Sequence, residues 1–304
     1  EVKPNPTVTN VQMGVEAFKK SGADCLVAIG GGSAMDTAKG IGIIITNPEF
    51  ADVVSLEGVA PTKHKSVPII ALPTTAGTGS EATQYAILTL HAKKTKSSIA
   101  AHIFADVSYL DPKYMDTLPA KTTNNTAVDA LTHLIESYLS VKANYVSRKI
   151  VEMGLSIFKD CIPALKARDY SADVRDKLML MSALGGAAIA QTMTSLPHGM
   201  GYFLTYEKGL PHGMANGVLT QAYVEQFPAG DEHVAKLLEC LDFADTKELG
   251  VFLDDVLDHE ATYTEEDLQY YTDRFMEQTG KIATFPYPLT RDDIYLMYRK
   301  SLMK

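Results

Sequence analysis

The chain has 304 residues, enough for two domains at about 150 residues each. Hydrophobic residues make up 46% and charged residues 21%, as in ordinary globular proteins, so the composition excludes a disordered or fibrous chain. The net charge of -9, with no lysine- or arginine-rich run, argues against nucleic acid or an anionic membrane as a partner. Cys25, Cys161 and Cys240 are widely spaced, which favours free thiols in a reducing compartment over a disulfide framework or a thiolate metal site.

The sequence shows neither a targeting signal nor a membrane-spanning segment. The sequence begins at Glu1 and shows no signal-peptide pattern. Its apolar runs are far shorter than the ~20 residues that cross a bilayer. We therefore expect a cytoplasmic protein, and the missing initiator methionine is compatible with a true beginning further upstream.

The first predicted unit is a helix at 8–21, a buried strand at 24–29 and a glycine turn at 30–32. Ser33 and Asp36, three residues apart, predict a capping box that opens the next helix. A strand, a glycine turn and a free helix N-terminus form an anion site suited to a diphosphate. The common G-x-G-x-x-G fingerprint is absent, and a plain tight turn explains these residues equally well.

A second unit repeats this arrangement. A strand is predicted at 67–72, followed by the sequence P-T-T-A-G-T-G-S-E at 73–81 and another helix start. Such a loop offers backbone N–H groups and hydroxyls to phosphate or ribose oxygens. Two such turns after two strands indicate one ligand that lies across the strand ends of an open α/β sheet.

A hairpin and a return strand are predicted next, at 85–90, 98–100 and 107–110, around the basic turn 93–96. Lysines in such a turn are usually only solvated, although one of them could neutralise a phosphate. Strand signals nearly vanish after Pro119. We therefore predict an α/β, Rossmann-like cofactor domain at 1–118 and an all-helical domain at 119–304.

The helical half carries the pentapeptide LPHGM twice, which puts His198 and His212 fourteen positions apart. In one unbroken helix the two imidazoles would lie about 21 Å apart, beyond the reach of a single ion. Gly201, Gly209 and Pro211 allow one helix to end and another to begin between them. Further caps or breaks are predicted at 144, 163, 169, 185–186, 228, 245 and 286–288, and 178–193 is predicted to be a close-packed core helix.

Asp129 and His133 are spaced i and i+4, so they lie on one helix face. Each of these groups alone is more often structural than functional. Together with His198 and His212 they form a set of three imidazoles and one carboxylate, which suits Fe(II), Zn(II), Mn or Co and leaves a coordination position open.

Four motifs in this order resemble those of the iron-containing (group III) alcohol dehydrogenases, over essentially the whole chain: G-G-G-S-x-x-D-x-A-K at 30–39, P-T-T-A-G-T-G-S-E at 73–81, D-A-x-x-H at 129–133, and H-G at 198 and 212. The resemblance implies a dehydroquinate synthase-like fold with a divalent ion, Fe(II) or alternatively Zn(II), held by Asp129, His133, His198 and His212. It also implies NAD or NADP on the following residues: Gly31, Gly32, Ser33, Asp36, Thr74, Thr75 and Thr78, flanked by Ile87 and Lys96.

Two departures from the family pattern stand out. Many members have H-G-x-x-H, where this sequence has Tyr202 in place of the second histidine, which is thought to relay the alcohol proton. With an ordinary pKa of about 10, a phenol is a poor shuttle at neutral pH, and water or the cofactor ribose serves equally well. Family members also begin with an earlier βαβ unit that reads the ribose 2′ position, so NAD and NADP both stay open.

The expected function is hydride transfer between NAD(P) and a small primary alcohol or diol, with the ion as Lewis acid. Apolar residues near the ligands favour an uncharged substrate: Met193, Leu196, Met200 and Phe203. The alternatives are a zinc glycerol dehydrogenase, a dehydroquinate synthase-like lyase, or an inactive family member. The lyase is disfavoured because no basic cluster is expected around the ligands in the helical half. A homodimer or larger homo-oligomer is expected.

Overall fold

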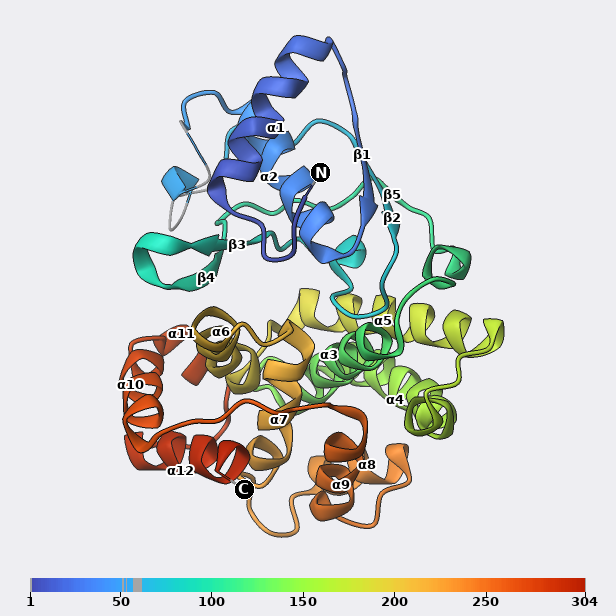
Figure 1. The fold of residues 1–304 in the computed structure, drawn as a ribbon, viewed down its shortest axis with the longest axis vertical. Helices are drawn as coiled ribbons and strands as arrows, with labels where there is room; N and C mark the ends of the chain where they lie inside the picture. Colours follow the sequence, from blue (N-terminus) through green and yellow to red (C-terminus); the bar gives the residue numbers. More distant parts are fainter. Residues whose placement is uncertain (1, 51, 53, 57–61, 304) are drawn as a thin grey trace.

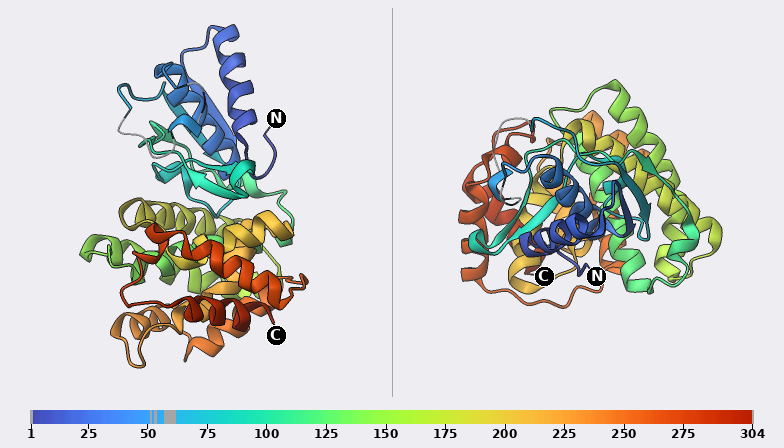
Figure 2. Two further views of the ribbon diagram at one scale, coloured as in Figure 1. Left: turned by 90° about the vertical axis from the view of Figure 1, so that its left-hand side faces the viewer. Right: turned by 90° about the horizontal axis from the view of Figure 1, so that it is seen from above.

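The computed structural model describes residues 2–50, 52, 54–56 and 62–303. An α/β part is stacked on a helical part in Figure 1 and in the left view of Figure 2. This arrangement confirms the predicted fold class. The strands end before Pro112 and the long helices begin at Ala120, while the division at 118/119 stays a prediction. None of the described helices is long and apolar enough to cross a membrane.

The α/β part contains a parallel sheet in the order β1-β2-β5 and a separate antiparallel hairpin, β3-β4. In the larger apolar core of this part, α1 and α2 pack against the sheet and the hairpin. The elements are α1 (Val8–Ser21), β1 (Leu26–Gly30), α2 (Gly32–Thr46), η1 (Val54–Leu56), β2 (Ile69–Pro73), η2 (Ser80–Ala82), β3 (Ile87–Leu90), η3 (His91–Lys93), β4 (Thr95–Ser98), β5 (Val107–Ser108) and η4 (Pro112–Met115).

The helical part has the larger apolar core, formed mainly by α3 to α7 and the helices around them. Its helices are α3 (Ala120–Leu139), α4 (Tyr145–Ala167), α5 (Ala172–Thr192), α6 (Leu196–Lys208), α7 (His212–Val224), α8 (Glu232–Leu241), α9 (Thr246–Val256), α10 (Glu265–Met276), α11 (Thr279–Ile282) and α12 (Arg291–Leu302). α3 packs against α4, α5 and α7, so it lies at the centre of this part.

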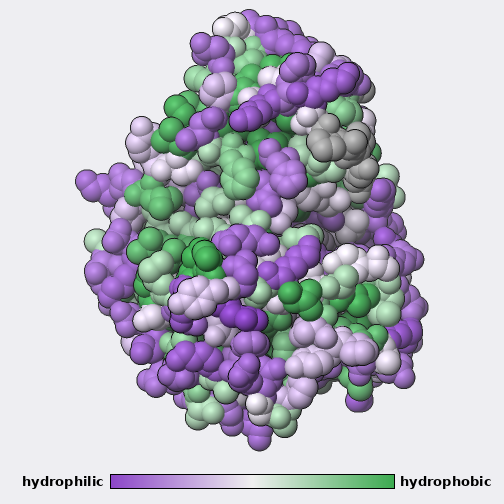
Figure 3. Space-filling view, turned by 180° about the vertical axis from the view of Figure 1, so that it is seen from behind, coloured by the Kyte–Doolittle hydropathy of each residue, from purple (hydrophilic) through white to green (hydrophobic). Residues whose placement is uncertain are grey.

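The prediction of a buried first strand was wrong in part. Within the part of the chain that the structure describes, β1 is an edge strand that pairs with β2 alone, and Val27 and Ile29 are 54% and 61% exposed. Ala28, which points to the opposite face, is buried. The rear view in Figure 3 shows hydrophobic surface among hydrophilic residues on the upper, α/β half. Apolar character alone therefore identified the strand but not the exposure of one of its faces.

Two expectations for the glycine and threonine turns were also wrong. The N-cap of α2 is Gly31, which makes no side-chain cap, and the Asp36 carboxylate instead accepts hydrogen bonds from Ser80 Oγ (2.7 Å) and Ile87 N (3.0 Å). Tertiary donors thus replace the predicted capping box. The helix expected after the threonine loop is only the short 3-10 turn η2.

Two predicted helix breaks lie inside helices. Pro163 is within α4, on an exposed face where water can satisfy the carbonyl that loses its N–H partner. Gly185 and Gly186 lie within α5, where small size permits close packing: a Cβ atom at position 186 would lie 2.3 Å from the Gly79 carbonyl oxygen. These residues therefore mark a packing contact and not an end of the helix.

The predicted reversal between the two LPHGM segments is confirmed. α6 ends at Lys208, Gly209 adopts a left-handed conformation (φ 69°) as its C-cap, and Pro211 precedes α7. Gly201, which was also expected to help end the helix, lies inside α6. α6 and α7 pack against each other. This reversal brings His198 and His212 together, with ring centroids 5.3 Å apart.

Candidate metal and cofactor site

A cavity of about 960 Å³ lies between the two parts of the molecule. The α/β part contributes the start of α2, the threonine loop and the β3-β4 hairpin to its wall. The helical part contributes α3, α6, α7, α10 and α11. The residues predicted to bind a dinucleotide and those predicted to bind a metal therefore share one cavity.

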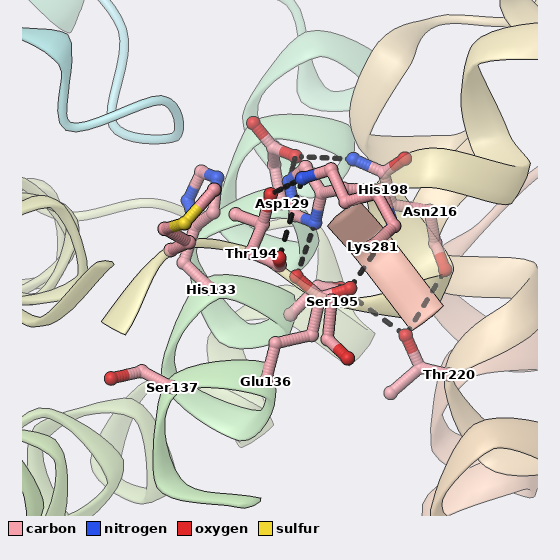
Figure 4. Close-up of polar contacts among 12 residues, drawn as sticks. Asp129, His133, Glu136, Ser137, Thr194, Ser195, His198, Asn216, Thr220 and Lys281 are labelled. Atoms are coloured by element: carbon pink, nitrogen blue, oxygen red, sulfur yellow. Dashed lines mark hydrogen bonds and ion pairs between the residues drawn. The ribbon is translucent and has the colours of Figure 1, made fainter. Parts of the chain in front are cut away.

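Three predicted metal ligands gather on the floor of this cavity. Asp129, His198 and His212 each offer a ligand atom, and these atoms lie within 4.8 Å of one another. Asp129 Oδ1 is 3.5 Å from His198 Nε2 and 3.9 Å from His212 Nε2. Figure 4 shows the side chains of Asp129 and His198 converging from α3 and α6.

His133 lies beside this cluster. Its ring stacks on His198 with centroids 4.4 Å apart, and its Nδ1 is 3.2 Å from the Gly77 carbonyl oxygen. Donation from Nδ1 to that carbonyl leaves Nε2 as the free ring nitrogen. Burial lowers the pKa of His133 to about 4, so the ring is neutral at pH 7 and can act as a ligand.

Glu136 fixes the orientation of His198. The Glu136 carboxylate is fully buried, and each of its oxygens contacts His198. Oε2 is 2.6 Å from His198 Nδ1, and Oε1 accepts from the His198 backbone N–H at 3.0 Å. Despite burial, the charge and hydrogen bonds of His198 lower the pKa of Glu136, so the carboxylate is ionised and only accepts. His198 must therefore donate from Nδ1 and turn Nε2 toward Asp129.

The charges around His198 and Asp129 favour a cation at this point. Burial opposes a charged imidazole, but Glu136 and Asp129 raise the pKa of His198 to about 8. Burial would also raise the pKa of Asp129, but the imidazoles, His212 foremost, hold it well below its ordinary value. Asn216 Nδ2 donates to Asp129 Oδ1 at 2.9 Å and so holds the carboxylate in place.

These residues fit a divalent metal ion. The buried Nε2 of His198 has no hydrogen-bond partner among the described residues, although it faces an ionised carboxylate. A buried polar atom without a partner is costly, and a metal ion in place of the proton would satisfy it. The donor set has nitrogen and oxygen but no thiolate, which suits Fe(II) or Zn(II).

The glycine turn and the threonine loop touch each other at the ends of β1 and β2. A Cβ atom on Gly31 would lie 2.8 Å from Thr75 Oγ1, and one on Gly32 would lie 2.6 Å from Thr78 Cγ2. Thr74 donates its N–H to the Gly30 carbonyl at 3.0 Å. Glycine is therefore required here for close approach between the two loops.

Most of the predicted cofactor residues line the cavity, namely Gly32, Ser33, Asp36, Thr78, Ile87 and Lys96. Gly31, Thr74 and Thr75 do not line the cavity and instead take part in the contact between the two turns. Lys96 belongs to β4, where it pairs with Thr89, and is not part of a free turn. Burial lowers the pKa of Lys96 to about 8, although the nearby carboxylates of Asp129 and Asp36 act to raise it.

Tyr202 lines the cavity and is only 7% exposed. Its ring stacks on His212 with centroids 5.8 Å apart. Burial, together with Glu136 and Asp129, raises the pKa of Tyr202 well above its ordinary value. The phenol therefore stays protonated at neutral pH, which makes it a hydrogen-bond donor and a poor proton shuttle.

The predicted apolar wall was only half right. Met193 and Phe203 line the cavity, whereas Leu196 and Met200 belong to the core. The helical part was expected to place no basic cluster around the ligands, yet two of its cationic side chains line the cavity, Arg274 on α10 and Lys281 on α11. Sequence spacing gave no sign that these helices fold back over the site.

Sequence reasoning missed Glu136, Asn216, Thr194 and Lys281. For Glu136 and Asn216 a signal was present: a carboxylate three residues after His133, and an amide four residues after His212, lie on the same helix faces as the ligands. Lys281 had no such signal, because its helix has no other predicted site residue.

Comparison with known proteins supports the same conclusion. Residues 1–112 match the family described as iron-containing alcohol dehydrogenase, and residues 123–250 match its C-terminal domain family. A solved iron-containing alcohol dehydrogenase from Thermotoga maritima superimposes with a TM-score of 0.90 and 31% identity, over 100% of this chain and 82% of that chain. The chain belongs to the iron-containing alcohol dehydrogenase family.

Two further similar proteins are informative. The lactaldehyde reductase of Escherichia coli strain K12 is 41% identical over 219 residues, which cover 72% of this chain and 57% of that protein. The chain thus aligns with little more than half the length of this curated relative. A sulfoacetaldehyde reductase from Bifidobacterium kashiwanohense, solved in complex with NAD+, superimposes with a TM-score of 0.88 and 26% identity, over 99% and 82% of the two chains.

Proposed function

We propose that the protein is a metal-dependent, NAD(P)-linked alcohol dehydrogenase that interconverts a small alcohol and its aldehyde. The observation that carries this proposal is the shared cavity, which joins the glycine and threonine turns to the cluster of Asp129, His198 and His212. The names of the two relatives, lactaldehyde reductase and sulfoacetaldehyde reductase, both denote reduction of a short aldehyde.

In this proposal His133 completes the ligand set, and Fe(II) is the preferred ion, with Zn(II) as the alternative. When bound, the ion would polarise the substrate oxygen while the dinucleotide exchanges a hydride with the substrate carbon. The chain itself holds and orients the partners. Glu136 keeps Nε2 of His198 directed at the site, and Asn216 keeps the Asp129 carboxylate in position.

The dinucleotide would lie along the α/β wall. The N-terminus of α2 has no side-chain cap, so its backbone N–H groups are available to a diphosphate. Ser33 and Thr78 line the cavity beside it, and Lys96 adds a positive charge. The proposed cofactor is NAD or NADP. The proposed location is the cytoplasm.

The experiment is a spectrophotometric assay of the purified protein loaded in turn with Fe(II) and Zn(II). Consumption of NADH or NADPH with lactaldehyde, and NAD(P)+ reduction with 1,2-propanediol, are the expected results. The activity should disappear in Asp129→Asn and persist in Asp106→Asn, which alters a carboxylate of the α/β part outside the cavity lining. Failure to turn over any short aldehyde with either ion would overturn the proposal.

A further inference from the structure

The cavity holds a cation that neither the metal site nor the cofactor wall uses. Lys281 lies on α11, at the helical side of the cavity, next to Thr194 and His198 in the wall. Its stem packs against the helix that carries His198: a Cβ atom on Gly199 would lie 3.0 Å from Lys281 Cγ. The lysine is therefore held directly beside the proposed ligand cluster, as Figure 4 shows.

The ammonium group of Lys281 has incomplete partners. Nζ donates to the Thr194 hydroxyl and, at 3.3 Å, to the Thr194 carbonyl oxygen. Among the described residues, no carboxylate oxygen forms an ion pair with it. An ammonium group has three N–H donors and is half-buried here, so one donor remains for a further acceptor.

Glu136 is the carboxylate whose charge acts on Lys281, but it does not fill this role. Its Oε1 accepts from the His198 backbone and its Oε2 from the His198 ring, so both oxygens are directed at His198. The charge of Glu136 thus supports the ammonium group from a distance and leaves the direct contact open.

Two other cations that line the cavity, Arg274 and Lys96, differ from Lys281. Arg274 is 3.5 Å from Glu277 Oε2 and donates to the Lys93 carbonyl at 2.9 Å, so it holds the hairpin against α10. Lys96 belongs to the opposite, α/β wall. Lys281 alone among these three combines a place beside the ligand cluster with an ammonium group that lacks a carboxylate partner among the described residues.

We propose that Lys281 and Thr194 form a subsite for a compact anion on the substrate, so that the preferred substrate is a short aldehyde or alcohol that carries a carboxylate or sulfonate. This inference rests on the proposed dehydrogenase function and specifies its substrate class. The ammonium group supplies a charge-assisted hydrogen bond, and the Thr194 hydroxyl is a second polar group at the same point.

The test compares two aldehydes of similar length, succinate semialdehyde and butanal, in the metal-loaded protein with saturating cofactor. In Lys281→Met, kcat/KM for succinate semialdehyde should fall about 10- to 100-fold while that for butanal changes little, as expected for loss of one charge-assisted hydrogen bond. Lys281→Arg should restore part of the preference. The matched control is Lys142→Met, which removes a nearby exposed charge outside the cavity lining.

A second measurement separates this inference from the proposed function. Binding of ethanesulfonate and propionate, followed by ligand-observed NMR, should be weakened about 10-fold or more in Lys281→Met but not in Lys142→Met. If no aldehyde is reduced, the proposed function fails while this measurement still decides on the anion subsite. Equal losses for both aldehydes in Lys281→Met, or unchanged anion binding, would overturn the inference and leave Lys281 as a structural counter-charge to Glu136.

Discussion

The contact between Glu136 and His198 determines how this histidine is presented to the proposed metal ion. A carboxylate that accepts from one ring nitrogen of a histidine fixes which nitrogen can bind a metal, and it makes that nitrogen more basic. The 2.6 Å contact with Nδ1 and the 3.0 Å contact with the backbone N–H restrain both the ring and its helix. Glu136 is thus a positioning residue for a proposed metal ligand.

We predict that Glu136→Gln weakens metal affinity by about 10- to 100-fold, because a neutral amide no longer favours the required tautomer. Competition between the protein and a chromophoric chelator for Zn(II) or Co(II) measures this directly, without any turnover. Glu266→Gln, on the exposed face of α10, is the control. Unchanged affinity in Glu136→Gln would show that the contact is only structural.

The charge state of Lys281 gives a pH prediction. Burial lowers its pKa to about 8, with Glu136 opposing the shift and Lys142 adding to it. Because only the protonated amine is a cation, the binding of propionate should be retained below pH 8 and lost as the pH rises through about 8. An exposed lysine would keep its charge until about 10.4. NMR titration between pH 6.5 and 9.5 measures the midpoint, and constant affinity to pH 9.5 would contradict the prediction.

For the individual site residues, the sequence predicted which side chains can bind a metal better than it predicted which side chains face the cavity. Asp129, His198 and His212 could be found because a helix spacing and a repeated pentapeptide predict where their side chains meet. Lys281 could not, since its position in the wall depends on how α11 packs on α6. Its role is visible only once the fold shows which acceptors are occupied.

Among the elements, α2 shows how one side chain can anchor a loop. Lys39 is 1% exposed and its ammonium group donates to the carbonyl oxygens of Ser80, Thr83 and Tyr85 at 2.7 to 2.8 Å, and to Ser80 Oγ at 2.9 Å. These bonds tie the loop between β2 and β3 to the helix that begins at the glycine turn. The cofactor wall depends on this connection.

We predict that Lys39→Met lowers the free energy of unfolding by about 3 kcal/mol, because several buried carbonyl groups lose their donor. Chemical denaturation at pH 7 measures the loss, at a pH where Lys39 is still protonated since burial lowers its pKa only to about 8. Lys20→Met, an exposed lysine of α1, should change stability little. Equal stability of the two variants would refute the anchoring role.

The helices also show where patterns mislead. Proline and paired glycines usually end helices, yet Pro163 and Gly186 lie inside α4 and α5. Solvent can replace the lost hydrogen bond at Pro163, and the glycine pair serves a contact with another part of the chain. Neither circumstance can be read from local sequence, because both depend on what surrounds the helix.

In the whole molecule, the α/β part contacts α5 of the helical part, and this contact determines the shape of the cavity. The threonine loop approaches α5 closely at Gly79 and Gly186. Gln84 Nε2 donates to the Ala190 carbonyl at 3.1 Å, and Tyr85 Oη donates to the Ile189 carbonyl at 3.3 Å. The two walls of the site are therefore connected by one close backbone approach and by two hydrogen bonds from side chains to backbone carbonyls.

We predict that Gly186→Ala costs about 2 kcal/mol or more, because the added Cβ atom would lie 2.3 Å from the Gly79 carbonyl oxygen and force the two parts to separate. Gly185→Ala is the matched control, since its Cβ atom would meet its nearest neighbour at 3.4 Å. Thermal unfolding and NADH binding measure the difference. Equal effects of the two substitutions would show that this contact does not hold the parts together.

Metal analysis of the purified protein shows directly whether a metal site lies between the two parts. After anaerobic purification and reconstitution, the wild type should hold one equivalent of iron or zinc. His212→Ala should lose it, whereas His102→Ala, an exposed histidine of the α/β part, should retain it. A wild-type protein that holds no metal even after reconstitution would contradict the proposed metal site.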